Sequence, residues 1–194
     1  LKDCVVDDFS DAASWLAVAS GQAKLKLTSE PGPHGRALRL DFDFKGGGGF
    51  IGVRKEFALR LPESYAFSFQ IRGAAPKNKL EFKLADPSGK NVWRWQEESF
   101  RFQNEPRALF LKSSAMEFAW GPAGGGTLRK LGPVEFIISA GPGGKGTVGI
   151  GCDEKRAAIS MASATLASRG FICLLSHLAL TAAMSATGLN ESSS

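Results

Sequence analysis

The stretch "LEFKLADPSGKNVWRWQ" (residues 80–96) contains two runs of alternating apolar and polar residues on either side of an Asp-Pro-Ser-Gly segment. Alternation with a period of two is typical of a β-strand that buries one face, and Asp, Pro, Ser and Gly favour turns. In the second run, Trp93 and Trp95 fall on the same face. The stretch therefore predicts two antiparallel strands joined by a short turn.

The same alternation continues along most of the chain. Its most regular example is "YAFSFQIRG" (residues 65–73), where large apolar residues alternate with Ser68, Gln70 and Arg72. Further alternating or β-branched runs occupy residues 23–28, 36–44, 50–59, 107–112, 116–120, 133–141 and 146–151. Many short strands with one apolar face each predict an all-β fold, a jelly-roll β-sandwich of two antiparallel sheets.

Segments rich in glycine and proline separate these runs. "SEPGPHG" (residues 29–35) is predicted to be a loop, and "KGGGG" (residues 45–49) a turn between strands. The glycine run lacks the Gly-x-x-x-x-Gly-Lys-Ser/Thr spacing of a phosphate-binding loop, so the sequence does not predict a phosphate site there.

Charge and hydropathy argue against two classes of partner. The formal net charge is +5, but lysine and arginine are interleaved with aspartate and glutamate, so no basic block indicates nucleic-acid binding. The most apolar window, residues 170–186, is interrupted by Ser176 and His177 and is shorter than the ~20 apolar residues of a membrane span. We expect neither a nucleic-acid nor a membrane partner.

The composition changes after Asp153. Residues 154–194 are rich in Ala, Ser and Leu and show hardly any β alternation. We therefore predict a β-sandwich domain over residues 1–153 and a short helical or disordered C-terminal extension over residues 154–194.

Five segments together resemble a known type of domain. They are "HGRALRLDFDFKGGGGF" (34–50), "YAFSFQIRG" (65–73), "LEFKLADPSGKNVWRW" (80–95), "EFAWGPAGG" (117–125) and "VEFIISAGPGGKGTV" (134–148). The chain resembles the carbohydrate-binding, galactose-binding-like jelly-roll domains of bacterial glycan-active enzymes and of discoidin-domain proteins. The resemblance covers about residues 4–150.

The resemblance implies a non-catalytic module that docks an attached glycan-active enzyme onto a polysaccharide. Its expected partners are a polysaccharide or oligosaccharide and the catalytic domain of the parent protein. The expected location is extracellular or periplasmic, as part of a larger bacterial protein. A chain that begins with Leu1 fits this expectation of a fragment.

A sugar site needs a flat apolar surface for the ring and polar groups for the hydroxyls. We predict stacking on Trp93 and Trp95. The predicted polar groups are Gln70, Arg72, Glu81, Lys83 and Asn91, on runs expected to pair as one meander. In the alternative, both indoles lie in the core, Arg94 and Gln96 line the polar face, and the ligand surface moves to the loops. Trp120 precedes a Gly-Pro turn, where a role in the core or at its rim is favoured.

Three aspartates form a candidate calcium site. Asp7 and Asp8 follow the first strand, and Asp153 follows the last predicted strand, so carboxylate oxygens from both ends could hold a hard cation in a structural role. The related domains close with a strand of the type Val-Trp-Ile-Asp-Asp-Leu, whereas this chain has "TVGIGCDEK" (147–155). We expect no other cofactor. Cys4 and Cys152 form a disulfide bridge or remain thiols.

The sequence contains little that indicates catalysis. His34 lies in the Pro/Gly segment and His177 in the extension, so no Ser-His-Asp or Cys-His arrangement can be assembled. Glu97 and Glu98 are adjacent and point to opposite faces of a strand. We predict that the chain is not an enzyme. Two other hypotheses stay open, a small sandwich-fold glycoside hydrolase or lyase and a protein-interaction or assembly module.

Overall fold

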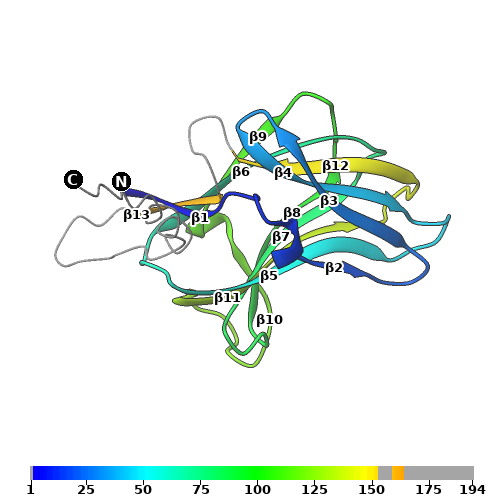
Figure 1. Ribbon diagram of the computed structural model, residues 1–194. Helices are drawn as coiled ribbons and strands as arrows, with labels where there is room; N and C mark the ends of the chain where they lie inside the picture. Colours follow the sequence, from blue (N-terminus) through cyan, green and yellow to red (C-terminus); the bar gives the residue numbers. More distant parts are fainter. Residues whose placement is uncertain (1, 153–158, 164–194) are drawn as a thin grey trace, which may run out of the picture.

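Two antiparallel β-sheets lie one over the other in the computed structural model, which describes residues 2–152 and 159–163 (Figure 1). Sheet I has seven strands: β1 (Lys2–Asp7), β3 (Lys24–Gly32), β4 (Gly35–Asp43), β6 (Tyr65–Ala74), β9 (Arg107–Lys112), β12 (Lys145–Gly151) and β13 (Ile159–Ser163). Sheet II has six: β2 (Leu16–Ala19), β5 (Phe50–Arg60), β7 (Asn78–Ala85), β8 (Val92–Phe100), β10 (Glu117–Trp120) and β11 (Lys130–Ser139). Two short 3-10 helices, η1 (Ala12–Ser14) and η2 (Ser113–Ala115), complete the elements.

The strand order identifies a jelly roll. Sheet I has the order β1-β13-β6-β12-β4-β3, with β9 on the other edge of β6, and sheet II has the order β10-β8-β7-β11-β5-β2. The chain passes repeatedly from one sheet to the other, as in a double-sheet jelly roll. The predicted all-β jelly-roll sandwich is confirmed. In the part of the chain that the structure describes, no helix has the length and hydrophobicity to cross a bilayer.

The expected meander of three runs is wrong in one respect. β7 and β8 pair in sheet II as predicted, with Phe82 opposite Trp95, but β6 belongs to sheet I. The link between Ala74 and Asn78 carries the chain from one sheet to the other. Alternation reports which face of a strand is buried and does not report its sheet, so both arrangements fit the pattern.

Two predicted boundaries are also corrected. β13 pairs with β1 and with β6, so the sandwich continues beyond residue 153 into the predicted extension. This pairing satisfies backbone groups along β1 and β6 that would otherwise form open edges. The predicted loop at 29–35 is a hairpin in which Pro31 lies opposite Arg36. Proline is tolerated there because β3 is an edge strand. Residues 164–194 lie outside the described residues.

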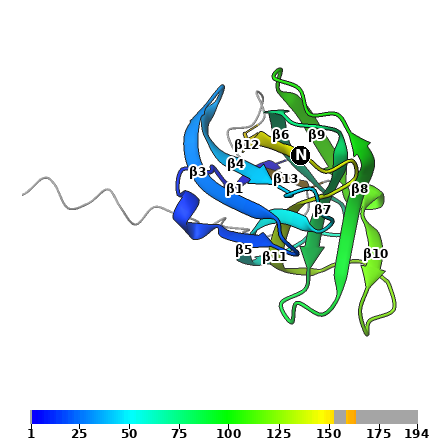
Figure 2. The same cartoon turned by 90° about the vertical axis from the view of Figure 1, so that its right-hand side faces the viewer.

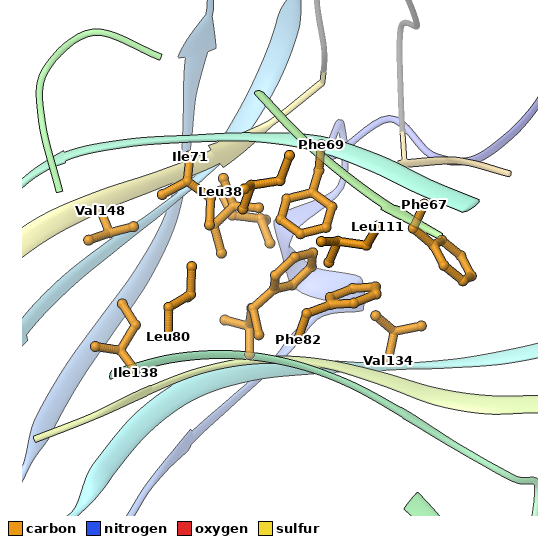
Figure 3. Packing of buried hydrophobic residues seen from close by; sticks show 14 of the residues in the cluster. Leu38, Phe67, Phe69, Ile71, Leu80, Phe82, Leu111, Val134, Ile138 and Val148 are labelled. Atoms are coloured by element: carbon orange, nitrogen blue, oxygen red, sulfur yellow. The ribbon is translucent and has the colours of Figure 1, made fainter. Parts of the chain in front are cut away.

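The core fills the space between the sheets. Phe69 of sheet I and Phe82 of sheet II point toward each other, with ring centroids 5.0 Å apart (Figure 3). Phe82 also lies 5.5 Å from Phe67 and 5.1 Å from Phe136. Aromatic pairs at these distances add about 0.5–1.5 kcal/mol each to the free energy gained by burial. The two sheets are therefore held by a continuous aromatic layer.

Replacing the central ring tests this packing. Phe82→Ala is expected to lower the free energy of unfolding by about 3–5 kcal/mol, because it leaves a cavity beneath three other rings. Urea unfolding measures the loss, and Leu16→Ala, at a side chain 62% exposed, is the control with a change under about 0.5 kcal/mol. Equal losses in the two variants would contradict the packing described.

Candidate functional site

Both tryptophans of the predicted stacking pair face the interior. Trp93 is 6% exposed and meets Phe118 edge to face at 5.3 Å, while Trp95 is half-buried against the core opposite Phe82. Indoles bury a large apolar area, so the alternating run turns them inward. Of the alternative, the structure therefore shows the inward-facing indoles, and the ligand surface on the loops stays a prediction. A double alanine substitution here is expected to destabilise the sandwich.

The predicted polar groups do not converge on one surface. Gln70 is buried, and Arg72 pairs with Glu30 at 2.7 Å on the outer face of sheet I. Glu81 and Lys83 lie on the outer face of sheet II, where Lys83 Nζ is 3.7 Å from Glu81 Oε2. Of this set, the structure brings these two together.

Asn91 holds the turn between β7 and β8. Its Nδ2 donates to Asp86 Oδ2 at 2.7 Å, and its Oδ1 accepts from the backbone N–H of Ala123 at 2.7 Å. Burial opposes ionisation of Asp86, but hydrogen bonds from Asn91 and Ser88 outweigh it and keep the pKa of Asp86 below its usual value. Asn91 thus joins this turn to the loop that follows β10.

The ring that faces solvent is Trp120. It is 48% exposed, more than any of the other three tryptophans. In a regular strand it would share the inward face of Phe118, two residues earlier. The pairing of β10 with β8 shifts between these two residues, so that Phe118 lies opposite Trp93 and Trp120 lies opposite Val92. An extra residue of this kind is a β-bulge, which turns the following side chain to the other face.

Trp93 and Asn91, both from the predicted site, hold the loop next to Trp120 in place. The Trp93 Nε1–H donates to the carbonyl of Gly126 at 2.8 Å, and Asn91 fixes the backbone of Ala123. Both bonds anchor the loop that leaves β10 directly after Trp120. The end of the strand that carries the Trp120 indole is therefore held in place by two hydrogen bonds.

A row of charged side chains crosses sheet II beside Trp120. Arg94, Lys83, Glu135 and Arg54 are successive cross-strand partners on β8, β7, β11 and β5. We call this outer face of sheet II, with Trp120 at its β10 edge, the Trp120 face. Lys83 Nζ lies 5.4 Å from the Trp120 ring centroid, a cation–π distance.

A pocket of about 140 Å³ lies between Trp120 and this row. Val92 contributes a buried apolar floor, and Arg54 and Glu135 form the opposite wall, joined by an ion pair of 3.0 Å. A hydrogen bond to Glu56 at 2.7 Å also raises the pKa of Arg54 above its usual value. An aromatic ring facing fixed polar groups across a concave surface is suited to a small polar ligand with an apolar face. Sequence reasoning missed Arg54 and Glu135, although Glu135 is the one charged residue in the apolar run at 133–138.

Glu81 is the electrostatic centre of the Trp120 face. It is 4% exposed, and its carboxylate lies 3.2 Å from Arg94, 3.7 Å from Lys83, 3.9 Å from Lys79 and 3.2 Å from the Ser139 hydroxyl. Lys83 is shared between Glu81 and the Trp120 ring, so Glu81 holds the cation that supports the indole. A buried carboxylate is stable here because it has three cationic partners.

Glu81→Gln tests this arrangement. The neutral amide leaves three cations without their shared anion, so the free energy of unfolding is expected to fall by about 3 kcal/mol. Thermal and urea unfolding measure the loss, with the exposed Glu105→Gln as a control that removes the same charge. An unchanged stability for Glu81→Gln would show that the cluster contributes nothing.

The described members of the predicted calcium site are engaged with protein groups. Asp7 pairs with the Lys55 ammonium and accepts hydrogen bonds from Phe9 N at 2.8 Å and Trp15 Nε1 at 3.4 Å. Asp8 accepts from Ser10 N at 2.9 Å. Lys55 thus takes the position of a cation at Asp7. Within the described residues no three acidic, His or Cys side chains could hold a metal ion, and Asp153 lies outside them, so the trio stays a prediction.

Cys152 directly follows β12 and is buried. Its thiol donates to the carbonyl of Asp8 at 3.7 Å, and burial together with Asp8 and Asp7 raises its pKa to about 11. The side chain of Cys4 lies outside the described part of the chain. The two alternatives for Cys4 and Cys152, a bridge or two thiols, therefore both stay predictions.

Comparisons with known proteins support the fold. The chain matches no protein-family profile and no curated protein sequence. It is similar to the solved family 11 carbohydrate-binding module of the cellulosomal cellulase Lic26A-Cel5E of Clostridium thermocellum, with a TM-score of 0.62 and 14% identity over 83% of this chain and 94% of that one. A family 11 module of Clostridium thermocellum in complex with a β-1,3-1,4-mixed-linked tetrasaccharide gives 0.61 and 16%, over 77% and 95%.

A third similar structure is a much longer enzyme chain. An exo-β-agarase gives a TM-score of 0.55 and 11% identity, with 81% of this chain covering 25% of the agarase chain. At these identities the similarity establishes the fold. The predicted jelly-roll fold is therefore confirmed, and the chain shares this fold with the two family 11 modules.

Proposed function

We propose that this domain is a non-catalytic carbohydrate-binding module whose ligand lies on the Trp120 face. The observation that carries the proposal is the exposed indole of Trp120, which a β-bulge turns out of the core beside a pocket with fixed charged groups. The similar family 11 module in complex with a tetrasaccharide supports a glycan as the ligand.

In this proposal each part of a sugar has a partner. The C–H face of a pyranose stacks on the Trp120 ring, and its hydroxyls bind the Arg54 and Glu135 pair, with Lys83 between them. The face crosses four strand spacings from β10 to β5, which is about 19 Å. Phe50, 37% exposed, lies on β5 at the far side. We infer that the ligand is a stretch of polysaccharide rather than a single sugar.

Ion pairing argues against hydrolysis on this face. A glycosidase needs two carboxyl groups about 5–10 Å apart, one of which donates a proton. Glu81 and Glu135 on the Trp120 face are both in ion pairs, and so are Glu97 with Arg107 and Glu98 with Lys79. These carboxylates are held as partners of cations, so we infer binding without catalysis.

A module of this kind acts by concentrating an attached enzyme on its substrate. The agarase chain, of which this fold occupies a quarter, supports the idea that such a domain occurs beside a catalytic domain. We propose that the parent protein is a bacterial glycan-active enzyme located outside the cell or in the periplasm.

Trp120→Ala tests the proposed function. Loss of the stacking surface is expected to weaken binding to a soluble mixed-linked β-glucan by about thirtyfold, or ~2 kcal/mol. Affinity electrophoresis across glucans, xylan and mannan measures the retardation. Phe110→Ala is the matched control, since Phe110 is also 48% exposed but lies on sheet I. A folded Trp120→Ala protein with unchanged retardation would place the site elsewhere, and release of reducing ends by the chain would favour the hydrolase hypothesis.

A further inference from the structure

The outer face of sheet I carries a second concave surface, on β3, β4 and β12. Figure 2 shows β3 and β4 on the side of the molecule opposite β8 and β10. The hollow is shallow and measures about 580 Å³. Its charged and polar lining consists of Lys24, Lys26, Asp41, Asp43, Lys145 and Thr147, and we call it the lysine hollow.

The acids of the lysine hollow already have partners. The Arg39 guanidinium binds both oxygens of Asp41 at 2.9 Å, and the Thr147 hydroxyl donates to Asp41 at 2.6 Å. Lys45 pairs with Asp43 at 2.8 Å. The hydrogen bond from Arg39 holds the pKa of Asp41 below its usual value, and Lys45 does the same for Asp43.

Three lysines of the hollow do not take part in these ion pairs. Lys24 and Lys145 lie on either side of Asp43 in register, and Lys26 lies beside Asp41. Among the salt bridges of the described residues, none includes these three ammonium groups. From strand geometry, the Cα of Lys24 lies about 7 Å from the Cα of Lys26 and about 10 Å from the Cα of Lys145. The hollow therefore presents three exposed ammonium groups from neighbouring strands.

The floor of the hollow lacks an exposed aromatic ring. Gly146 lies opposite the core residue Phe42 and adds no side chain to the hollow. The Phe42 side chain is 5% exposed and belongs to the core. Single-stranded nucleic acids are held by stacking on aromatic side chains, and duplex grooves admit protruding elements. Neither requirement is met by this part of the face.

We propose that the lysine hollow is a second glycan site, which binds a segment of an anionic polysaccharide through its carboxylate or sulfate groups. Charge complementarity to the three lysines selects the ligand, and the shallow open shape admits a continuous chain. The site is independent of the Trp120 face, because it lies on the other sheet and offers no stacking surface.

The experiment uses the 194-residue chain with two polyanions. Polygalacturonate presents carboxylates and dextran sulfate presents sulfates, so the two probes distinguish the source of the charge. The combined variant Lys24→Gln, Lys26→Gln and Lys145→Gln is expected to weaken polyanion binding about tenfold at low ionic strength. Binding of the wild-type chain is expected to fall with added salt. Lys90→Gln, Lys112→Gln and Lys130→Gln together are the control with the same change of charge.

The two sites give separable outcomes. The combined lysine variant is expected to retain β-glucan binding, and Trp120→Ala to retain polyanion binding. Equal losses in the control and the combined variant would overturn the proposal, since general charge would then explain the binding. Unchanged binding by the folded lysine variant, or a DNA oligonucleotide bound as tightly as both polyanions and lost in the same variant, would also overturn it.

Discussion

The shared apolar interior of the two sheets is the constraint on which the structure depends. Each strand must turn one face toward the aromatic layer around Phe82, because burial of that layer is what holds the sheets together. The opposite face of each strand is then free of this requirement. A large apolar ring on an outer face therefore needs a separate cause, and Trp120 has one.

That cause is a single extra residue in β10. Without the shift in pairing after Phe118, the period of two would place Trp120 beside Phe118 against the core. The bulge sends the second ring outward while the first keeps its contact with Trp93. An exposed indole loses part of the free energy that its burial would give. The hydrogen bond from Trp93 to Gly126 keeps the loop next to Trp120 in place. The bulge thus exposes the ring that the proposed ligand role requires.

Alternation within each run made the fold predictable from sequence. It identified the inward faces of Phe67 and Phe82 and the hairpin of β7 and β8, because burial of one face depends on local pattern. Three features were not predictable in this way. The sheet that β6 joins, the pairing of β13 and the bulge before Trp120 all depend on contacts between segments distant in sequence. The pattern therefore identified the β7–β8 hairpin and placed Trp93 and Trp95 on one face, but it could not decide that this face is the inward one.

The two outer faces differ in which charges the protein itself uses. On sheet II the cations surround the buried Glu81, and Arg54 is held between Glu56 and Glu135, so the positive groups near Trp120 are already balanced. Such a face can offer hydrogen bonds in fixed directions with little net attraction for ions, which suits a neutral ring stacked on an indole. On sheet I the acids are engaged and lysines remain, so long-range attraction dominates over stacking. The two proposed sites thus differ in charge, because the balance of partners is set separately on each sheet.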